Sequence, residues 1–299
     1  MLKKTMSLLR KKEARIAYLF LFPTLAGFAT FVIGPMFASI FISLYKWDIL
    51  GSPRFIGLSN YLHLLKDGRL LTCYSNTFRF VIFAVGFNVV SALLIAVAIN
   101  AKMNNVLRGF YRSAVFLPVM LSAAAVSVVW FFLLDTDFGV VNYYLLKLGF
   151  KKIPWLTSSR YSLLSIVLVD VWKILGFNVV LFSAGLQNIP RHLYEAALID
   201  GASRWHSFRY ITIPMLSPTL FFAIVWALIG AFQVFDYPFI MTLGGPGDSS
   251  RTIVLYLYEH GFRFFSMGYA SSIALSLFMI ILLLTLLQLR LGERWVFYG

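Results

Sequence analysis

The sequence predicts an all-α integral membrane protein with six transmembrane helices. Of its 299 residues, 60% are hydrophobic and 13% are charged, whereas in soluble domains about a quarter of the residues are charged. Apolar stretches that exceed the roughly 20 residues needed to cross a bilayer alternate with polar connections. Aromatic residues, 17% of the chain, suit membrane interiors and interfaces. We therefore expect one membrane domain over residues 16–289, with tails at 1–15 and 290–299 and no internal repeat.

The six spans are assigned to the apolar stretches in chain order. The first, residues 16–45, is interrupted by Pro23, Gly34 and Pro35, which indicates a kink or a tilted helix. A polar connection follows, in which residues 61–71 form a short amphipathic piece. The remaining spans are expected at residues 77–101, 113–134, 161–185, 216–243 and 269–289.

The distribution of Lys and Arg predicts which side of the membrane each connection faces. Six spans place both termini on one side. If that side is the cytoplasm, the cytoplasmic segments carry 14 of the 26 basic residues and the outer segments carry 10, with Arg79 and Lys173 inside spans. The N-terminal tail is the most basic segment, although the outer connection 135–160 is also basic. The positive-inside rule therefore predicts cytoplasmic termini and a cytoplasmic segment 190–214, and it accounts for the net charge of +14 without nucleic acid.

Several kinds of chemistry lack their motifs in this sequence. The chain has no Gly-Lys dipeptide, so it has no P-loop for ATP, and its four histidines are too scattered for a zinc site. Residues 245–248 match the Gly-x-Gly-Asp pattern of intramembrane aspartyl proteases. However, the nearest second aspartate, Asp236, is too close in sequence to lie on another span, and Pro246 indicates a turn. The single cysteine, Cys73, has no partner for an internal disulfide.

Few ionisable residues fall within the predicted spans, and such residues are costly in hydrocarbon unless they face a partner or a cavity. Asp170 and Lys173 lie three residues apart on one helix face and are expected to pair. The alternative is that they line a polar path with Trp172, Asn178 and Gln187. Asn88 is expected to join two helices by hydrogen bonding. The scarcity of buried carboxylates argues against a proton-coupled carrier.

The polar segment 190–214 lies between the predicted fourth and fifth spans. Pro190 suits the first position of a short helix, and Gly201 suits its end, because glycine takes the left-handed conformation freely. One face of this short helix carries residues at intervals of four, Leu193, Ala197 and Gly201. Their side chains become smaller along the helix, so another surface could approach this face closely. The alternative is that the segment only connects two spans.

The spacing within this segment resembles the EAA loop of binding-protein-dependent ABC importer permeases. Glu195-Ala-Ala is followed after three residues by Gly201, and nine residues later by Ile211-x-Ile-Pro214, where Ile213 replaces the usual Leu. Further stretches across nearly the whole chain resemble the carbohydrate-uptake branch, the maltose/sn-glycerol-3-phosphate/oligosaccharide type. They are residues 55–61, 76–77, 116–118, 137–142, 185–190, 235–236 and 242–247.

The resemblance implies a type I ABC importer permease fold with a cytoplasmic coupling helix, in a bacterial inner membrane. It implies that the chain binds no cofactor itself, and that ATP and Mg belong to two ABC ATPase subunits. The other implied partners are a second permease, an extracytoplasmic solute-binding protein and membrane lipid. The residues implied to contact the ATPase are Glu195, Ala196, Ala197, Asp200, Gly201, Ala202, Phe208, Ile211 and Pro214. Phe208 and Trp205 are expected to pack the second short helix of the segment against the spans.

The family binds sugar near the middle of the fourth and fifth spans, which implies a solute path through this chain. The residues in that region are Trp172, Gly176, Asn178, Val179, Gly230, Ala231, Gln233 and Asp236. Much of this lining is small or apolar, so the polar pattern of a maltose-type site is not reproduced. The alternatives are import of sn-glycerol-3-phosphate or a polyol by the same architecture, a stand-alone secondary carrier, and a membrane enzyme. The absence of metal and nucleophile motifs disfavours the enzyme.

Overall fold

The computed structural model describes residues 17–100 and 103–297, and the described chain is mainly helical. The basic tail, residues 1–15, lies outside the described residues. The chain forms two compact units, one of residues 17–65 and 259–275 and one of residues 66–258 and 276–297. Among the described residues, five helices are long and apolar enough to cross a membrane, and a bent pair brings the total to six if it counts as one span. The predicted all-α membrane architecture is confirmed.

The first unit begins with the apolar helix Ala17–Ile42. The interruption predicted from Gly34 and Pro35 is a π-helical turn, η1 (Ala29–Ile33), after which the helix continues as α2 (Gly34–Ile42). A two-stranded antiparallel hairpin follows, β1 (Tyr45–Lys46) and β2 (Arg54–Phe55), and then α3 (Ser59–Lys66). The hairpin is held because Asn60 Nδ2 donates to the Ser43 and Tyr45 carbonyls at 2.7 and 3.0 Å. The unit is completed by η5 (Glu259–Arg263) and the first turns of α13 (Met267–Trp295).

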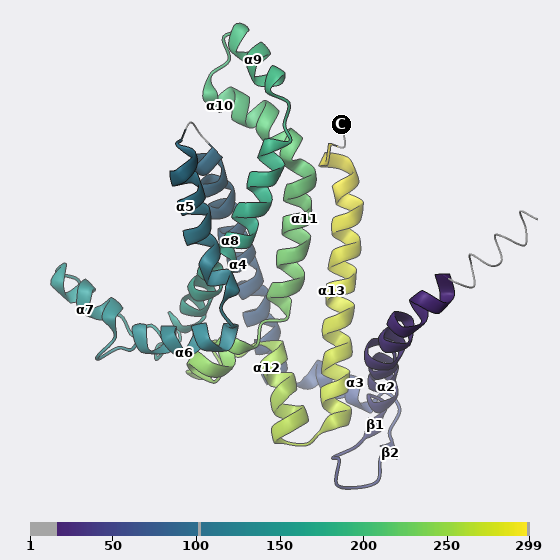
Figure 1. Ribbon diagram of the computed structural model, residues 1–299. Coiled ribbons are helices and arrows are strands. Elements are labelled where there is room, and N and C mark those ends of the chain that lie inside the picture. Colours follow the sequence, from purple (N-terminus) through teal and green to yellow (C-terminus); the bar gives the residue numbers. More distant parts are fainter. Residues whose placement is uncertain (1–16, 101–102, 298–299) are drawn as a thin grey trace, which may run out of the picture. The chain divides into compact units, whose positions relative to one another are not determined.

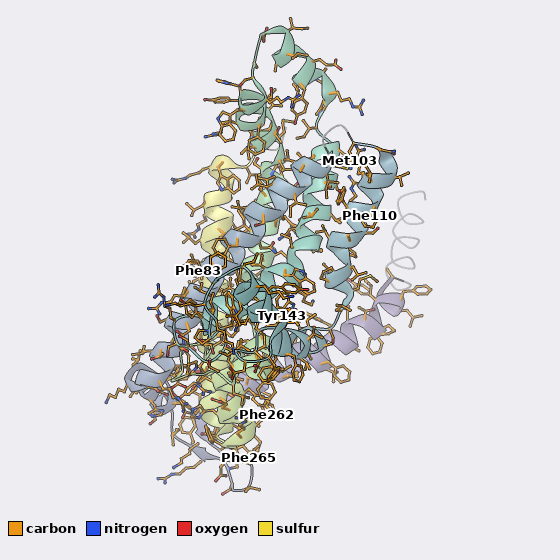
Figure 2. All side chains as sticks on the ribbon, turned by 90° about the vertical axis from the view of Figure 1, so that its left-hand side faces the viewer. Phe83, Met103, Phe110, Tyr143, Phe262 and Phe265 are labelled. Atoms are coloured by element: carbon orange, nitrogen blue, oxygen red, sulfur yellow. The ribbon has the colours of Figure 1, made fainter. Side chains whose placement is uncertain are left out.

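The core of the second unit lies between α4 (Gly68–Asn100), α8 (Ser162–Gln187) and α11 (Ile213–Phe232) (Figure 1). α4 and α8 pack most extensively against each other. Small residues allow this close approach, as is typical of membrane helices. The buried cluster that the three helices share consists of Ala92, Ala96, Ile99, Val179, Phe182, Leu216, Leu220 and Ala223. Large aromatic side chains such as Phe83 and Phe110 instead project from the outside of the helices (Figure 2).

The third span is broken, which the sequence analysis did not predict. α5 (Asn105–Phe116) runs into a 3₁₀ turn, η2 (Leu117–Met120), and the axis then bends by 99° into α6 (Ala123–Leu133). The break follows from local chemistry, because Pro118 disfavours continued α-helix and the Ser122 hydroxyl caps a new helix at the Ala125 N–H. A short helix, α7 (Val140–Lys147), follows α6. The span predicted at 113–134 therefore corresponds to the bent pair α5 and α6, which starts earlier than predicted, at Asn105.

Other predicted boundaries also move. α4 begins at Gly68, so part of the predicted amphipathic piece 61–71 belongs to the second span. The fifth span ends at Phe232 instead of 243, because Gln233 terminates α11 and a separate π-helical turn, η4 (Pro238–Thr242), follows. α13 continues to Trp295, so most of the predicted tail 290–299 is helix.

Connections that were predicted to be cytoplasmic gather at one end of the second unit. Near this end, Asn100 Oδ1 accepts hydrogen bonds from Arg112 and Gln187 at 3.0 and 3.3 Å. The Phe297 N–H donates to the Ser217 hydroxyl at 2.9 Å. Figure 1 shows the segment after α8 at the same end as the last turns of α13. Connections that all face the cytoplasm must lie at the same end of the helices, as these do.

Candidate functional site

The segment between α8 and α11 folds into α9 (Arg191–Ile199), α10 (Arg204–Ser207) and a π-helical turn, η3 (Phe208–Thr212). Pro190 is the N-cap of α9, one position before its predicted place. Gly201 ends α9 in the left-handed conformation, with φ +76°, as predicted from the glycine at this position. The Ala202 N–H donates to Ala197 O at 2.9 Å and the Gly201 N–H to Leu198 O at 3.1 Å, which is the hydrogen-bond pattern of a Schellman motif.

Two further contacts order the segment. The Tyr194 hydroxyl lies 2.9 Å from the Thr212 hydroxyl, which ties α9 to η3. Ser203 caps α10 by accepting from the His206 N–H at 3.3 Å. A hollow of about 310 Å³ lies under the segment, lined partly by Tyr194, Leu198 and Phe208. The segment is therefore a defined structure and not a loose connector.

The segment carries large apolar side chains that are exposed. Leu198 and Ile199 are 76% and 86% exposed, and Trp205 and Tyr210 are 68% and 69% exposed. We call these four residues, together with the exposed Glu195 and Ala196, the coupling surface. Large apolar side chains that stay exposed are typical of a protein interface.

The predicted residues of this segment divide between the two sides. Glu195, Ala196, Asp200 and Gly201 are exposed, whereas Leu193 and Ala197 are half-buried, so the predicted Leu193–Ala197–Gly201 face turns partly towards the chain itself. Ala202, Phe208, Ile211 and Pro214 are also half-buried. The packing predicted for Trp205 against the spans is wrong, because its exposed ring contacts only Phe208 among the described aromatic rings, at 5.6 Å between centroids.

A cavity of about 290 Å³ lies in the second unit between η2, α8 and α11. On α8 its lining follows one helix face, Asp170, Ile174, Phe177 and Asn178, and α11 closes the other side. The lining from η2 and α11 consists of Val119, Trp226, Ala227, Gly230 and Ala231. The cavity thus combines aromatic rings with one carboxylate and one carboxamide, a combination suited to a polar organic solute.

Only part of the predicted solute path lines this cavity. Asn178, Gly230 and Ala231 do so. Trp172 lines a smaller neighbouring hollow of about 170 Å³, where its ring lies 5.5 Å from that of Trp130. Gln233 is the exposed C-cap of α11, and Asp236 is half-buried beyond it.

Two residues of the predicted path are packing residues, which corrects the prediction. Val179 is fully buried in the core cluster. Gly176 lies against the end of α5, where an added Cβ would come within 2.7 Å of the Phe116 Cα. Sequence reasoning did not identify Phe177 or Trp226, although the spacing of Phe177 from Asp170 and Asn178 on one helix face could have indicated it.

The buried polar residues of α8 are arranged differently from the predicted pair. Within the described residues no ion pair joins Asp170 to Lys173; instead, Asp170 is 8% exposed and lines the cavity. The predicted role of Asn88 is confirmed, because its Oδ1 accepts a hydrogen bond from Asn178 Nδ2 between α4 and α8. Asn178 therefore both joins two helices and lines the cavity.

An ion cluster closes the opposite end of the second unit. Arg69 binds Asp248 through two hydrogen bonds of 2.7 and 2.9 Å, and Arg251 Nε donates to Asp248 at 2.5 Å. The hydrogen bonds from Arg69 lower the pKa of Asp248 to about 2. Asn76 Nδ2 also donates to the Asp248 and Arg251 carbonyls at 2.6 and 3.1 Å. These contacts fix the segment between η4 and α12 (Ile253–Tyr258) to the start of α4.

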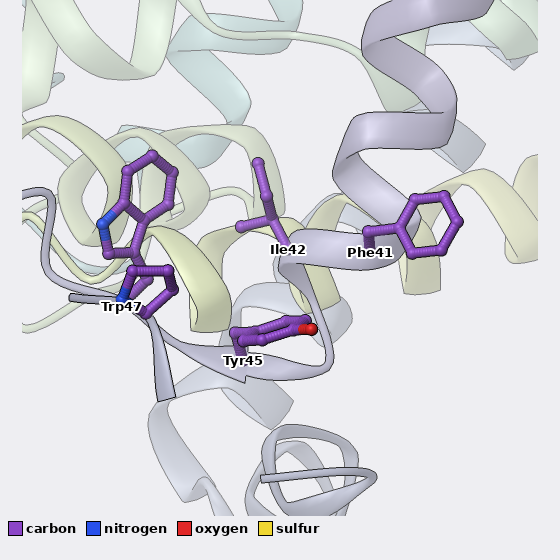
Figure 3. A pocket seen from close by; sticks show the side chains of 5 residues that line it. Phe41, Ile42, Tyr45 and Trp47 are labelled. Atoms are coloured by element: carbon purple, nitrogen blue, oxygen red, sulfur yellow. The ribbon is translucent and has the colours of Figure 1, made fainter. Parts of the chain in front are cut away.

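The first unit has its own hollow, of about 370 Å³, beside the hairpin (Figure 3). Phe41, Ile42, Tyr45, Trp47 and Pro53 line it. The Trp47 indole N–H already donates to the Gly51 carbonyl at 3.2 Å. This hollow is almost wholly apolar and offers few groups that would orient a polar solute. No group of three or more metal-ligating side chains occurs in the described part of the chain.

Comparison with known proteins gives consistent matches. Residues 88–296 match the family model described as binding-protein-dependent transport system inner membrane component. The chain is 34% identical over 278 residues to the probable ABC transporter permease YurN of Bacillus subtilis, covering 92% of this chain and 95% of that one. It is 33% identical over 289 residues to the trehalose/maltose transport permease MalF of Thermococcus litoralis, covering 96% and 97%.

The fold also matches a solved structure. A chain of a bacterial alginate ABC transporter, crystallised with its alginate-pentasaccharide-bound periplasmic protein, superposes with a TM-score of 0.85 at 24% identity, covering 95% of this chain and 96% of that chain.

Proposed function

Because the chain belongs to the family of binding-protein-dependent transport system inner membrane components, we propose that it carries a sugar or oligosaccharide through a bacterial inner membrane. It is the permease of an ABC importer and a transport subunit, and such permeases work with a solute-binding protein. The energy comes from ATP hydrolysis in partner subunits. One observation carries the proposal: an exposed apolar surface at one end of the second unit carries the spacing of the EAA loop.

The coupling surface is the site where an ATPase subunit docks. Leu198 and Ile199 supply apolar area, and the exposed Glu195 carboxylate accepts a charge-assisted hydrogen bond from the ATPase. The Schellman turn at Gly201 sets the angle between α9 and α10. Because Tyr194 and Thr212 tie α9 to the start of α11, movement of the docked ATPase is transmitted to a helix that lines the cavity.

The cavity between α8 and α11 is part of the solute path. Phe177 and Trp226, with ring centroids 6.1 Å apart, offer aromatic surface to a sugar ring. Asp170 and Asn178 offer hydrogen-bonding groups for hydroxyls. Among the described residues that line the cavity there is no Lys or Arg to pair with a phosphate group, which favours a neutral sugar or polyol over sn-glycerol-3-phosphate.

The complete importer contains a second permease, two ABC ATPase subunits with ATP and Mg, and the solute-binding protein. In the proposed orientation the cytoplasmic segments are residues 102–112, residues 190–214 and the two terminal tails. The grouping of these connections at one end of the second unit supports placing them on one side of the membrane, and the positive-inside rule favours the cytoplasm as that side. The ion cluster at Asp248 then lies at the outer end.

The test reverses a charge on the coupling surface. Glu195→Lys is expected to abolish solute uptake by the reconstituted importer, while the subunit still inserts, because it replaces an acceptor with a cation at the docking surface. Glu293→Lys is the matched control, since Glu293 is exposed near the C-terminal end of α13 and undergoes the same charge change outside the segment. Uptake at the unsubstituted rate in Glu195→Lys would exclude docking at this surface.

A further inference from the structure

The connection from α6 through α7 projects from the side of the second unit. α6 runs at 99° to the helix before it, and Figure 1 shows α7 farther from the helices of the core than α6. The turn between α6 and α7 carries Asp135, Thr136 and Asp137. Because such groups and their irregular backbone are not tolerated in lipid hydrocarbon, this turn lies at the level of the membrane–water interface. α7, which starts at Val140, therefore lies at the same level.

A single buried side chain makes this projection a defined structure. Asn142 is 1% exposed. Its Nδ2 donates to the Thr136 and Ile153 carbonyls at 3.1 and 2.9 Å, and its Oδ1 accepts from the Ile153 N–H at 3.0 Å and from the Trp155 indole at 3.2 Å. The Ser165 hydroxyl, on α8, then donates to the Trp155 carbonyl at 2.9 Å. α7 is thus held to the core and presents a fixed surface.

That surface combines exposed apolar side chains with lysines. Its apolar members are 48% to 73% exposed and are Phe138, Val140, Tyr143, Tyr144, Leu146, Leu148 and Phe150. Lys147 Nζ lies 4.6 Å from the centroid of the Tyr143 ring, so the cation sits among the aromatic residues. Figure 2, seen from the side on which α7 projects, shows Tyr143. Lys152 pairs with Asp137 at 3.1 Å, whereas in the described part of the chain neither Lys147 nor Lys151 forms an ion pair with a carboxylate.

The apolar side chains and the lysines together indicate what covers this surface. A surface with seven exposed apolar side chains is costly to leave in water. A solute-binding protein that docks and leaves would cover the surface only for part of the cycle, whereas the membrane covers it always. Tyr and Lys side by side at the interface depth are typical of membrane anchoring. Unpaired lysines on the side that the positive-inside rule leaves poor in cations call for an anionic partner.

We propose that α7 and the residues up to Lys151 form an interfacial anchor that binds anionic phospholipid headgroups. The assignment to the outer leaflet rests on the orientation proposed above, because α6 and α7 follow the end of α5 that is opposite to the coupling surface. The lipid-binding surface itself depends on neither the solute nor the ATPase. A failure of solute transport and a failure of lipid binding are therefore separate results.

The test measures lipid contact directly in the assembled transporter. Leu148→Cys is labelled with an environment-sensitive fluorophore; Cys73, the other cysteine of this chain, is fully buried. Nanodiscs then contain doxyl-labelled phosphatidylglycerol or doxyl-labelled phosphatidylcholine at the same mole fraction. We expect stronger quenching by the anionic lipid. Replacing Lys147 and Lys151 by Gln should reduce the preference roughly fivefold for each lysine.

Two controls separate lipid binding from structure. Lys147→Arg with Lys151→Arg should keep the preference, because charge is retained. Lys66→Gln, which removes an exposed lysine from α3, should not change it. Equal quenching by the two lipids would overturn the proposal. Fluorophore shielding that appears only when the solute-binding protein is added would also overturn it and assign the surface to that protein.

Discussion

The turn at Gly201 allows the docking account to be tested with a single methyl group. Gly201 has φ +76°, and nothing lies within 4 Å of the position that a Cβ would occupy. In Gly201→Ala, the added methyl group therefore meets no neighbour, and its cost is the left-handed conformation alone, about 1–2 kcal/mol. If ATPase docking requires the angle that this turn sets, the equilibrium constant for the docking-competent conformation falls by a factor of about 5 to 30.

Asparagine is the matched control, because it is the other residue that commonly ends helices in this conformation. The assay measures the apparent affinity of purified ATPase for the permease in proteoliposomes, together with solute uptake. We expect Gly201→Ala to weaken ATPase binding by up to that factor and Gly201→Asn to retain most of it. Unchanged binding in Gly201→Ala, or an equal loss in both variants, would refute the reasoning, since neither outcome follows from backbone strain.

Two further predictions concern packing and charge in the second unit. Gly176→Ala should destabilise the purified protein by about 1–3 kcal/mol, because the methyl group meets the backbone of α5; Gly230→Ala, where a Cβ has open space, is the control, and equal thermal stability of the two variants would contradict the packing role. Asp248→Asn should cost about 1 kcal/mol at neutral pH, since solvent screens the partly exposed cluster. Because the pKa of Asp248 is lowered from 3.8 to about 2, its stabilisation is present above about pH 5 and is lost as the pH falls towards 2. Thermal unfolding as a function of pH should therefore be flatter in acid for Asp248→Asn, and identical acid profiles would refute the ion cluster.

Much of the fold could be predicted because the thickness of the bilayer sets the length of the apolar stretches that cross it. Hydropathy located the spans but not their breaks. The apolar run continues through Pro118 and Ser122, so its hydropathy did not locate the 99° bend. The capping hydroxyl of Ser122 was a local signal that could have been used. The fifth span was overextended because residues 234–243 are also largely apolar, and within the unit several of them are buried by protein.

The parts of the site that depend on local backbone conformation could be predicted from the sequence. The glycine at 201 specified the turn, and the motif spacing specified the segment. Which side of α9 is open, and that Trp205 faces outwards, depends on packing against residues distant in sequence. Similarly, α8 has small and apolar residues on every face, so Gly176 and Val179 could not be separated from the cavity-lining Phe177 without knowing where α4, α5 and α11 lie.

The most direct test of the central claim is solute uptake into proteoliposomes with each partner supplied in turn. We predict uptake only when the second permease, the ATPase subunits, internal ATP and the solute-loaded binding protein are all present. ATP hydrolysis should rise when that binding protein is added. Uptake by this chain alone, driven by an ion gradient without ATP, would contradict the account and establish a secondary carrier.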